Sequence, residues 1–212
     1  MAEVISFTFN PFQENTYLVA DDSGECVIFD PGCYEDAEKE QLRSKIEEHG
    51  LKPVRLINTH CHIDHIFGNR FVYETYGLPL EIHRDEKPVL KAAPEAGALF
   101  GIMMQEISPE PGGFLEEGDL IEFGSTSLRT LLTPGHSPAS LSFYCEEEDF
   151  VIAGDVLFQG SIGRTDLPGG DFDTLIQSIR EKLLPLGDSV RVYPGHGPAT
   201  YIGYERQHNP FL

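Results

Sequence analysis

The stretch THCHIDHIFGN, residues 59–69, carries three histidines and one aspartate: His60, His62, Asp64 and His65. Imidazole nitrogens and carboxylate oxygens are ligands of zinc and similar first-row metals. In a strand His65 would point away from the other three, and in a pure helix positions two apart point about 200° apart. The four side chains therefore converge only where a strand turns through a loop into a helix. We expect a metal site at such a turn; the alternative is a histidine-rich loop without a metal.

Three further candidate ligands each follow an apolar segment typical of a buried strand. They are His136 in LTPGHSPAS, Asp155 in VIAGDVLF and His196 in VYPGHGPAT. The adjacent glycines allow tight turns where backbone passes close to an ion. One tetrahedral ion with an open position would not take four ligands from a single loop, so a second ion is expected. Each of the three is weak evidence alone, and their combination with the histidine cluster carries the prediction.

The other histidines and the cysteines are expected to lie outside this chemistry. We interpret His49, His83 and His208 as solvent-facing or capping residues. The four cysteines show no CxxC spacing, which argues against a cysteine zinc site and predicts free thiols in a reducing compartment. Cys61 lies between two candidate ligands and should point away from them.

Strands and helices alternate along the chain in a way that predicts an α/β layered fold, with one domain over residues 1–212. Residues 88–114 mix Pro and Gly with Ala, Phe and Met, which predicts short helical pieces in a long connection. We favour a lip over the site for this connection, against a plain structural crossover. Strands are expected at 4–9, 16–20, 26–30, 54–59 and 190–195, with four more between 119 and 155; helices are expected at 35–49, 66–76 and 172–184.

Composition restricts the partners. Lys+Arg 15 against Asp+Glu 35 gives a formal charge of -20, which repels nucleic acid and anionic membrane surfaces. No run approaches 18 apolar residues, and the first residues lack the basic and apolar regions of an export signal. We therefore expect a cytoplasmic protein with a small-molecule partner, no nucleic acid and no membrane association. The oligomeric state stays open, with a homo-oligomer as one of the alternatives.

The motifs HCHIDH (60–65), GH (135–136), GD (154–155) and GH (195–196), with VIFDPG (27–32), resemble the metallo-β-lactamase superfamily over nearly the whole chain. The resemblance implies an αββα four-layer sandwich with the active site at one edge of its two sheets. It also implies that Asp30 orients a ligand histidine, the alternative being a turn aspartate before Pro31. The implied metal ligands are His60, His62 and His136 for one ion and Asp64, His65 and His196 for the second, with Asp155 bridging both.

Two longer motifs narrow the likeness within that superfamily. SIGRTDLPGGD (161–171) and PGHGPATYIGYERQHNPF (194–211) resemble the short glyoxalase II-like hydrolases, relatives of hydroxyacylglutathione hydrolase. The added C-terminal helical domain of the full-length enzymes contributes to their glutathione site and is absent here, so another thioester, a small ester or a different thiol carrier stays open. Antibiotic hydrolysis is disfavoured, because the best-known β-lactamases carry cysteine where Asp155 stands. Nuclease activity is disfavoured because the further nuclease domain and the basic surfaces are missing.

The resemblance implies thioester hydrolysis by a metal-bound hydroxide, with Asp64 orienting the water and accepting its proton. Two divalent ions are expected, zinc foremost, with iron and manganese as alternatives. Arg164 or the 88–114 segment is expected to contact substrate; alternatively Arg164 only pairs with Asp166 or Asp171. Two other functions stay open: a persulfide dioxygenase with one iron, since GRTD also occurs there, and a non-enzymatic metal-binding module.

Overall fold

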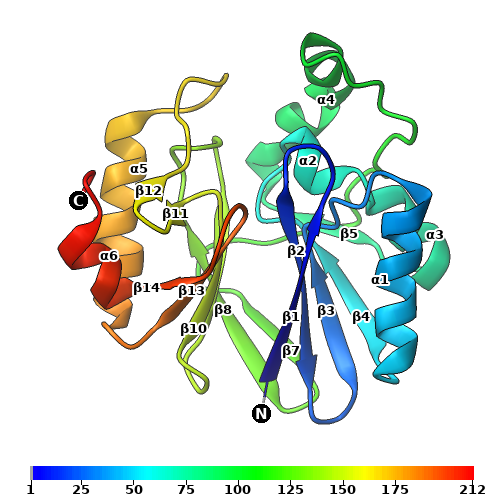
Figure 1. Ribbon diagram of the computed structural model, residues 1–212, viewed down its shortest axis with the longest axis horizontal. Coiled ribbons are helices and arrows are strands. Elements are labelled where there is room, and N and C mark those ends of the chain that lie inside the picture. Colours follow the sequence, from blue (N-terminus) through cyan, green and yellow to red (C-terminus); the bar gives the residue numbers. More distant parts are fainter. Residues whose placement is uncertain (1) are drawn as a thin grey trace. The chain divides into compact units, whose positions relative to one another are not determined.

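The computed structural model describes residues 2–212 and divides the chain into two compact units. The first unit runs through Phe114 and includes Glu122–Thr126, and the second comprises Leu115–Ile121 and Ser127–Leu212. β-Sheets and helices are both present throughout (Figure 1). The α/β class is thus observed, and the assignment of residues 1–212 to one domain stays a prediction.

The sheet of the first unit has the strand order β1-β2-β3-β4-β5-β6. Its first three strands are antiparallel, and β3, β4, β5 and β6 are parallel to one another. Because parallel strands end at the same edge of a sheet, the residues after β3 and β4 emerge side by side. The strands are β1 Ala2–Phe9, β2 Glu14–Asp21, β3 Glu25–Phe29, β4 Lys52–Ile57, β5 Leu80–Ile82 and β6 Gly113–Phe114.

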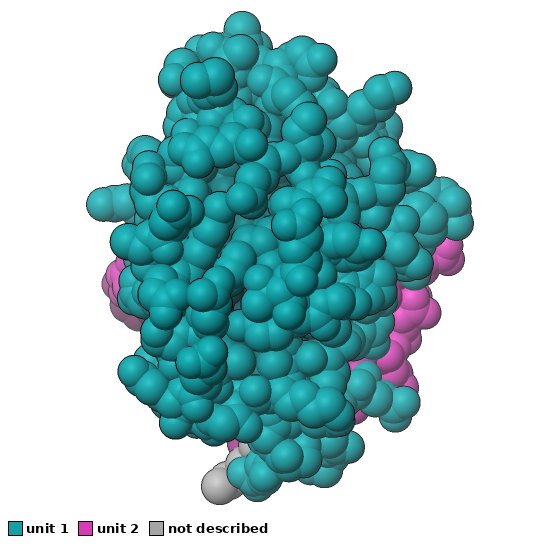
Figure 2. All heavy atoms as spheres, turned by 90° about the vertical axis from the view of Figure 1, so that its right-hand side faces the viewer, with its two compact units in different colours: residues 1–114, 122–126 teal, residues 115–121, 127–212 magenta. Residues whose placement is uncertain are grey.

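Helices α1 (Asp36–Glu48) and α3 (Asn69–Tyr76) lie on one face of this sheet (Figure 1), and Figure 2 shows the molecule from that side. A capping box between Glu35 and Glu38 begins α1, and the left-handed Gly77 ends α3. Helix α1 buries Leu42 and Ile46 in the core of the first unit. No helix within residues 2–212 is long and apolar enough to cross a membrane.

The helix expected at 66–76 is instead two helices, α2 (Ile63–Ile66) and α3, separated at Gly68. A Cβ atom at Gly68 would stand 2.3 Å from Cys33 Sγ and 2.8 Å from the Pro31 carbonyl oxygen. The Gly68 amide also donates to that carbonyl at 2.7 Å. The helix is therefore interrupted where its backbone packs directly against the turn after β3. Sequence periodicity does not reveal this contact.

The expectation of short helical pieces in 88–114 is wrong in its first half. The 3-10 turn η1 (Arg84–Glu86) leads into α4 (Lys87–Leu99), which is 13 residues long, and an irregular connection, residues 100–112, follows it. Pro88 falls in the first turn, where its missing N–H has no partner to lose. The alanines around Pro94 favour the helix strongly enough to carry it past that residue.

A second sheet has the order β14-β13-β10-β9-β8-β7 and contains the four strands expected between 119 and 155. In the second unit, strands β9, β10 and β13 pack with α5 around buried aliphatic residues such as Val151, Leu175 and Val192. The strands are β7 Leu120–Phe123, β8 Thr126–Leu132, β9 Leu141–Cys145, β10 Phe150–Gly154, β13 Arg191–Pro194 and β14 Thr200–Tyr201; β11 Leu157–Phe158 and β12 Ser161–Ile162 form a separate hairpin.

The helix expected at 172–184 begins where predicted but changes its geometry. Helix α5 (Phe172–Ser178) starts with Asp171 capping the Thr174 amide at 2.8 Å. It continues as a π turn (η2, Ile179–Leu183) and a 3-10 turn (η3, Leu184–Leu186) containing Pro185, which cannot continue an α-helix. A last helix, α6 (Ile202–His208), was not predicted.

Asp21, the last residue of β2, accepts hydrogen bonds from the turn that follows β2 and from the turn between β7 and β8. Its carboxylate accepts from the Ser23 amide at 2.7 Å, the Ser125 hydroxyl at 2.9 Å and the Thr126 hydroxyl at 2.8 Å. These bonds, with those of Ser23 foremost, hold the pKa of Asp21 well below its usual range. The ionised carboxylate is thus part of the folded structure.

We predict that Asp21→Asn lowers the melting temperature at pH 7, and that the difference from the wild type shrinks in acid. A carboxyl group whose pKa falls on folding stabilises the fold above its unfolded pKa, about 3.9, and loses that contribution as the pH falls towards its folded value. Thermal melts from pH 7 to pH 2 measure this. The exposed neighbour Asp22 provides the control Asp22→Asn, and a difference for Asp21→Asn that does not change with pH would contradict the prediction.

Candidate metal centre

The first unit gathers all four predicted ligands of the stretch after β4. His60 and His65 are fully buried, while His62 and Asp64 are partly exposed. The His60 ring lies 4.1 Å from that of His65 and 4.8 Å from that of His62, between ring centres. The Nε2 atom of His65 is 3.7 Å from Asp64 Oδ2. The strand-to-helix turn that the spacing required is therefore present, in what we call the histidine loop (residues 58–66).

Asp30, directly after β3, organises this loop. Its Oδ1 accepts from the Thr59 amide at 2.7 Å, and its Oδ2 accepts from the Thr59 hydroxyl at 2.6 Å and lies 3.0 Å from His65 Nδ1. A carboxylate can only accept, so Nδ1 of His65 carries the proton and Nε2 keeps its lone pair for a metal. Asp30 also has a positive φ of 47°, so it is both the turn residue and a partner of a candidate ligand.

The Thr59 hydroxyl sets the tautomer of His60 in the same way. It donates to Asp30 and lies 3.0 Å from His60 Nδ1, which must then be the donor of that second bond. The Nε2 atom of His60 is thereby left with its lone pair. Both buried imidazoles of the first unit are consequently oriented through Nδ1, an arrangement typical of metal-binding histidines.

The second unit brings its three predicted ligands together at the ends of its strands. Asp155 Oδ2 lies 3.4 Å from His136 Nε2 and 3.5 Å from His196 Nε2. His136 and Asp155 are buried, and His196 is partly exposed. The Nδ1 atom of His136 donates to the Arg164 backbone carbonyl at 2.7 Å, which again leaves Nε2 for a metal. One carboxylate oxygen thus stands between two imidazoles.

These separations fit divalent ions. Two ligands each about 2.1 Å from a tetrahedral ion lie roughly 3.4 Å apart. The two contacts of Asp155 match that spacing, and the donor set of imidazole and carboxylate groups is one that zinc, iron and manganese accept. Each unit therefore carries a cluster of His and Asp suited to a metal, and the donor set does not select one metal among the three.

Gly163 allows the second cluster to form. A Cβ atom there would stand 1.9 Å from the Asp155 carbonyl oxygen and 3.1 Å from His136 Nδ1. Both are backbone or tightly held atoms, so any side chain at this position would displace the two candidate ligands. The glycine of the GRTD sequence is thus explained by close packing against the cluster.

Arg164 has an exposed side chain and pairs with Asp166. Its Nε and Nη2 atoms donate to the two carboxylate oxygens at 2.7 Å each, and these bonds lower the pKa of Asp166 to about 2. Asp171, the other partner considered for Arg164, instead caps α5. Contact between Arg164 and a substrate stays a prediction.

Sequence reasoning missed two buried acids next to the histidine loop. Glu14 is fully buried in β2, with Oε1 3.9 Å from His65 Nδ1. Burial raises the pKa of Glu14 well above its usual range, and the nearby Asp30 carboxylate raises it further. Glu86, also fully buried, accepts from the Cys61 amide at 2.9 Å. Neither residue had a sequence signal, because a glutamate in a strand or at a helix start ordinarily faces solvent.

The remaining cysteine and histidine predictions are confirmed. The four cysteines are free and buried, and Cys61 lies in the apolar core of the first unit, where burial raises the pKa of its thiol. His49 ends α1, and His83 accepts from the Asp85 amide at 3.2 Å. His208 bonds the Tyr204 carbonyl and stacks on the Tyr204 ring.

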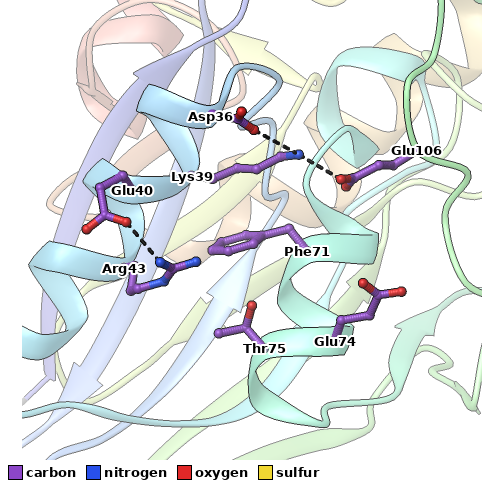
Figure 3. Close-up of a pocket in the computed structure, with 8 residues that line it drawn as sticks. All are labelled: Asp36, Lys39, Glu40, Arg43, Phe71, Glu74, Thr75 and Glu106. Carbon is purple, nitrogen blue, oxygen red and sulfur yellow. Dashed lines mark hydrogen bonds and ion pairs between the residues drawn. The ribbon is translucent and has the colours of Figure 1, made fainter.

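A cavity of about 370 Å³ lies in the first unit between α1 and α3, apart from the candidate ligands (Figure 3). Its two basic side chains are already paired: Lys39 Nζ lies 2.9 Å from Glu106, and Arg43 lies 2.9 Å from Glu40. We therefore interpret the cavity as a place where α1 holds the connection that contains Glu106. Its lining residues are Asp36, Lys39, Glu40, Arg43, Phe71, Glu74, Thr75 and Glu106.

Residues 9–196 match the model of the metallo-beta-lactamase superfamily, and the chain belongs to that family. It is 46% identical to the probable metallo-hydrolase YqgX of Bacillus subtilis, over 95% of this chain and 93% of that protein. It is 38% identical to the hydroxyacylglutathione hydrolase GloC of Haemophilus influenzae, over 99% of this chain and 97% of that protein.

Two solved structures are similar over almost their whole length. The BLEG-1 B3 metallo-beta-lactamase has a TM-score of 0.90 and 38% identity, covering 99% of both chains. TTHA1623, solved in a di-iron-bound form, has a TM-score of 0.88 and 39% identity, covering 98% of this chain and 100% of its own. The predicted metallo-β-lactamase fold is confirmed, and the family and its relatives support a metal-dependent hydrolase.

We predict that Asp30→Ala weakens zinc binding by about 10–100-fold, the usual effect of losing the partner of a ligand histidine. Without the carboxylate, neither the Thr59 hydroxyl nor His65 Nδ1 keeps its acceptor, so both imidazoles lose their fixed tautomer. Competition with a chromophoric zinc chelator measures the affinity. The control Asp36→Ala removes an exposed acid of α1, and an unchanged affinity in Asp30→Ala would contradict the role assigned to Asp30.

Proposed function

We propose that the protein is a thioester hydrolase with a dinuclear metal centre, zinc being the favoured metal. In this proposal His60, His62 and His136 would hold one ion, Asp64, His65 and His196 would hold the other, and Asp155 would be a ligand of both. The observation that carries the proposal is the Asp155 carboxylate oxygen, placed 3.4 and 3.5 Å from two imidazole Nε2 atoms. The similarity to a hydroxyacylglutathione hydrolase over 99% of the chain supports the substrate class.

Bound divalent ions would supply Lewis acidity and bring the pKa of a water molecule to about 7. Asp64 is partly exposed beside His65 Nε2, so its carboxylate is the group that orients the attacking water and accepts its proton. The Asp30 carboxylate holds His65, and the Arg164 carbonyl holds His136, during the reaction. A thiolate leaves without help from a strong general acid, and the proposed mechanism assigns that role to no residue.

The proposed centre is locally cationic in an acidic protein. Two divalent ions bring four positive charges, against which Asp64 and Asp155 set two negative ones. An anionic thioester can therefore be attracted to the site although the formal charge of the chain is -20. That overall charge supports a small-molecule substrate and opposes nucleic acid, and we place the protein in the cytoplasm. The carrier thiol is left open between glutathione and another small thiol.

The persulfide dioxygenase is the second candidate, and a relative solved with two irons makes iron worth testing. The proposal expects protein purified without added metal to contain two divalent ions and to hydrolyse members of a small thioester panel. One iron with oxygen uptake on glutathione persulfide would replace it by the dioxygenase. Hydrolysis of a β-lactam without thioester turnover would move the protein towards the BLEG-1 type of enzyme, and a bound metal without any turnover would indicate a binding module.

Asp155→Ala is expected to lose most of one metal equivalent and to lower kcat/KM for its best thioester by more than about 100-fold. The loss on removing a bridging ligand should be larger than the roughly 10–100-fold loss that follows removal of a hydrogen-bond partner of a ligand. Metal content is measured by plasma emission and turnover by thiol release. Asp173→Ala, at the exposed first turn of α5, is the control. Full metal content and wild-type turnover in Asp155→Ala would exclude the bridging role.

Arg164→Ala is expected to raise KM for an anionic thioester by about 10-fold with little change in kcat. Loss of one charged hydrogen bond has about this effect on binding, and a contact used equally in ground and transition states changes KM alone. The backbone carbonyl that holds His136 is kept in this variant. Asp166→Asn, which removes the partner of Arg164, should not raise KM. An unchanged KM in Arg164→Ala would show that Arg164 only pairs with Asp166.

A further inference from the structure

Two buried asparagines link the histidine loop to the connection after α4. Asn58, the first residue of the loop, is fully buried and donates through Nδ2 to the His65 carbonyl at 2.9 Å and to Asp30 Oδ1 at 3.3 Å. Asn69, the first residue of α3, is also fully buried and donates through Nδ2 to Asn58 Oδ1 at 2.7 Å. Its other contact from that nitrogen is Ser108 Oγ at 2.8 Å.

The direction of every bond in this chain is fixed by chemistry. A carboxylate and a carbonyl can only accept, so the amide nitrogen of Asn58 must face Asp30 and His65. Its oxygen then faces Asn69, which must donate. Both amide hydrogens of Asn69 are thereby used, one on Asn58 and one on Ser108. A continuous hydrogen-bonded chain thus runs from Ser108 on the connection to the residues that hold His65.

The connection, residues 100–112, is held to the rest of the first unit by further contacts, and these do not involve the histidine loop. The Tyr34 hydroxyl donates to the Met103 carbonyl at 3.0 Å, and Arg70 Nε donates to the Ile107 carbonyl at 3.0 Å. The Lys39–Glu106 ion pair, visible in Figure 3, is a third contact. Arg70 is therefore a matched comparison for its neighbour Asn69, since both donate to the connection and Asn69 also donates to Asn58.

We propose that Asn69 is a positioning residue of the metal centre, acting through Asn58 on His65, and that docking of the connection at Ser108 tunes metal affinity. The proposal rests on the dinuclear centre proposed above. Buried amides that lose a partner carry a free-energy penalty, and hydrogen bonds in a chain reinforce one another. Release of Ser108 therefore loosens Asn69, and the disturbance reaches the His65 carbonyl and Asp30 through the hydrogen bonds of Asn58.

The test compares Asn69→Leu, Ser108→Ala and Arg70→Ala with the wild type. Leucine keeps the shape of the asparagine side chain and removes its donors. Zinc affinity for each of the two equivalents is measured by chelator competition, loosening of residues 100–112 by hydrogen exchange, and the His65 tautomer by nitrogen NMR of the imidazoles. We expect Asn69→Leu to weaken one equivalent by about 10-fold or more, within the range for groups that hold ligand histidines, and to alter the His65 signals.

The two other variants separate the chain of bonds from general loosening. Ser108→Ala should weaken the same equivalent by a few-fold, and it keeps the test available if Asn69→Leu does not fold. Arg70→Ala should increase hydrogen exchange in 100–112 with both zinc affinities unchanged. Wild-type affinities in Asn69→Leu and Ser108→Ala, or an equal loss in Arg70→Ala, would overturn the proposal. Two bound zinc ions without thioester turnover in the wild type would instead refute the proposed function, while these affinities would still test Asn69.

Discussion

The arrangement of the histidine loop depends on the carboxylate of Asp30. It accepts hydrogen bonds from the amide and hydroxyl of Thr59 and from Asn58, and it contacts His65. The positive φ of Asp30 is unfavourable for residues other than glycine, and the surrounding hydrogen bonds hold the backbone in this conformation. The parallel pairing of β3 and β4 fixes the strand ends, and the Thr16 hydroxyl donates to the Asp30 carbonyl at 2.8 Å.

The second unit reaches the same result with a backbone group. Its His136 is oriented by the carbonyl of Arg164, which lies just after the β11–β12 hairpin. Fully buried Glu205 holds that hairpin, because it accepts from the Gly160 amide at 2.9 Å and from the Thr200 hydroxyl at 2.5 Å. In both units, therefore, an imidazole is fixed through Nδ1, by a buried carboxylate in the first unit and by a backbone carbonyl in the second.

Side-chain period accounts for what the sequence could predict about the site. His60, His62, Asp64 and His65 cannot converge on a regular strand or helix, so their turn was predictable, and the structure has it between β4 and α2. The major strands followed from apolar runs, and the helix that begins at Phe172 starts where it was predicted. The break at Gly68 did not, because it results from contact with Pro31 and Cys33, which lie more than thirty positions earlier.

Asn58, Asn69 and Glu14 show the same limit in the site itself. Each is polar, fully buried and useful only through a partner brought near by the fold, such as Asp30 for Asn58 or Thr16 for Glu14. Local pattern assigns polar residues to the surface, so it misplaces all three. Burial of these groups carries a penalty that only paired hydrogen bonds or a nearby charge can offset. Asp30 and Asp64 place two carboxylates beside His65, and their negative charge favours a cation there over an apolar or anionic group.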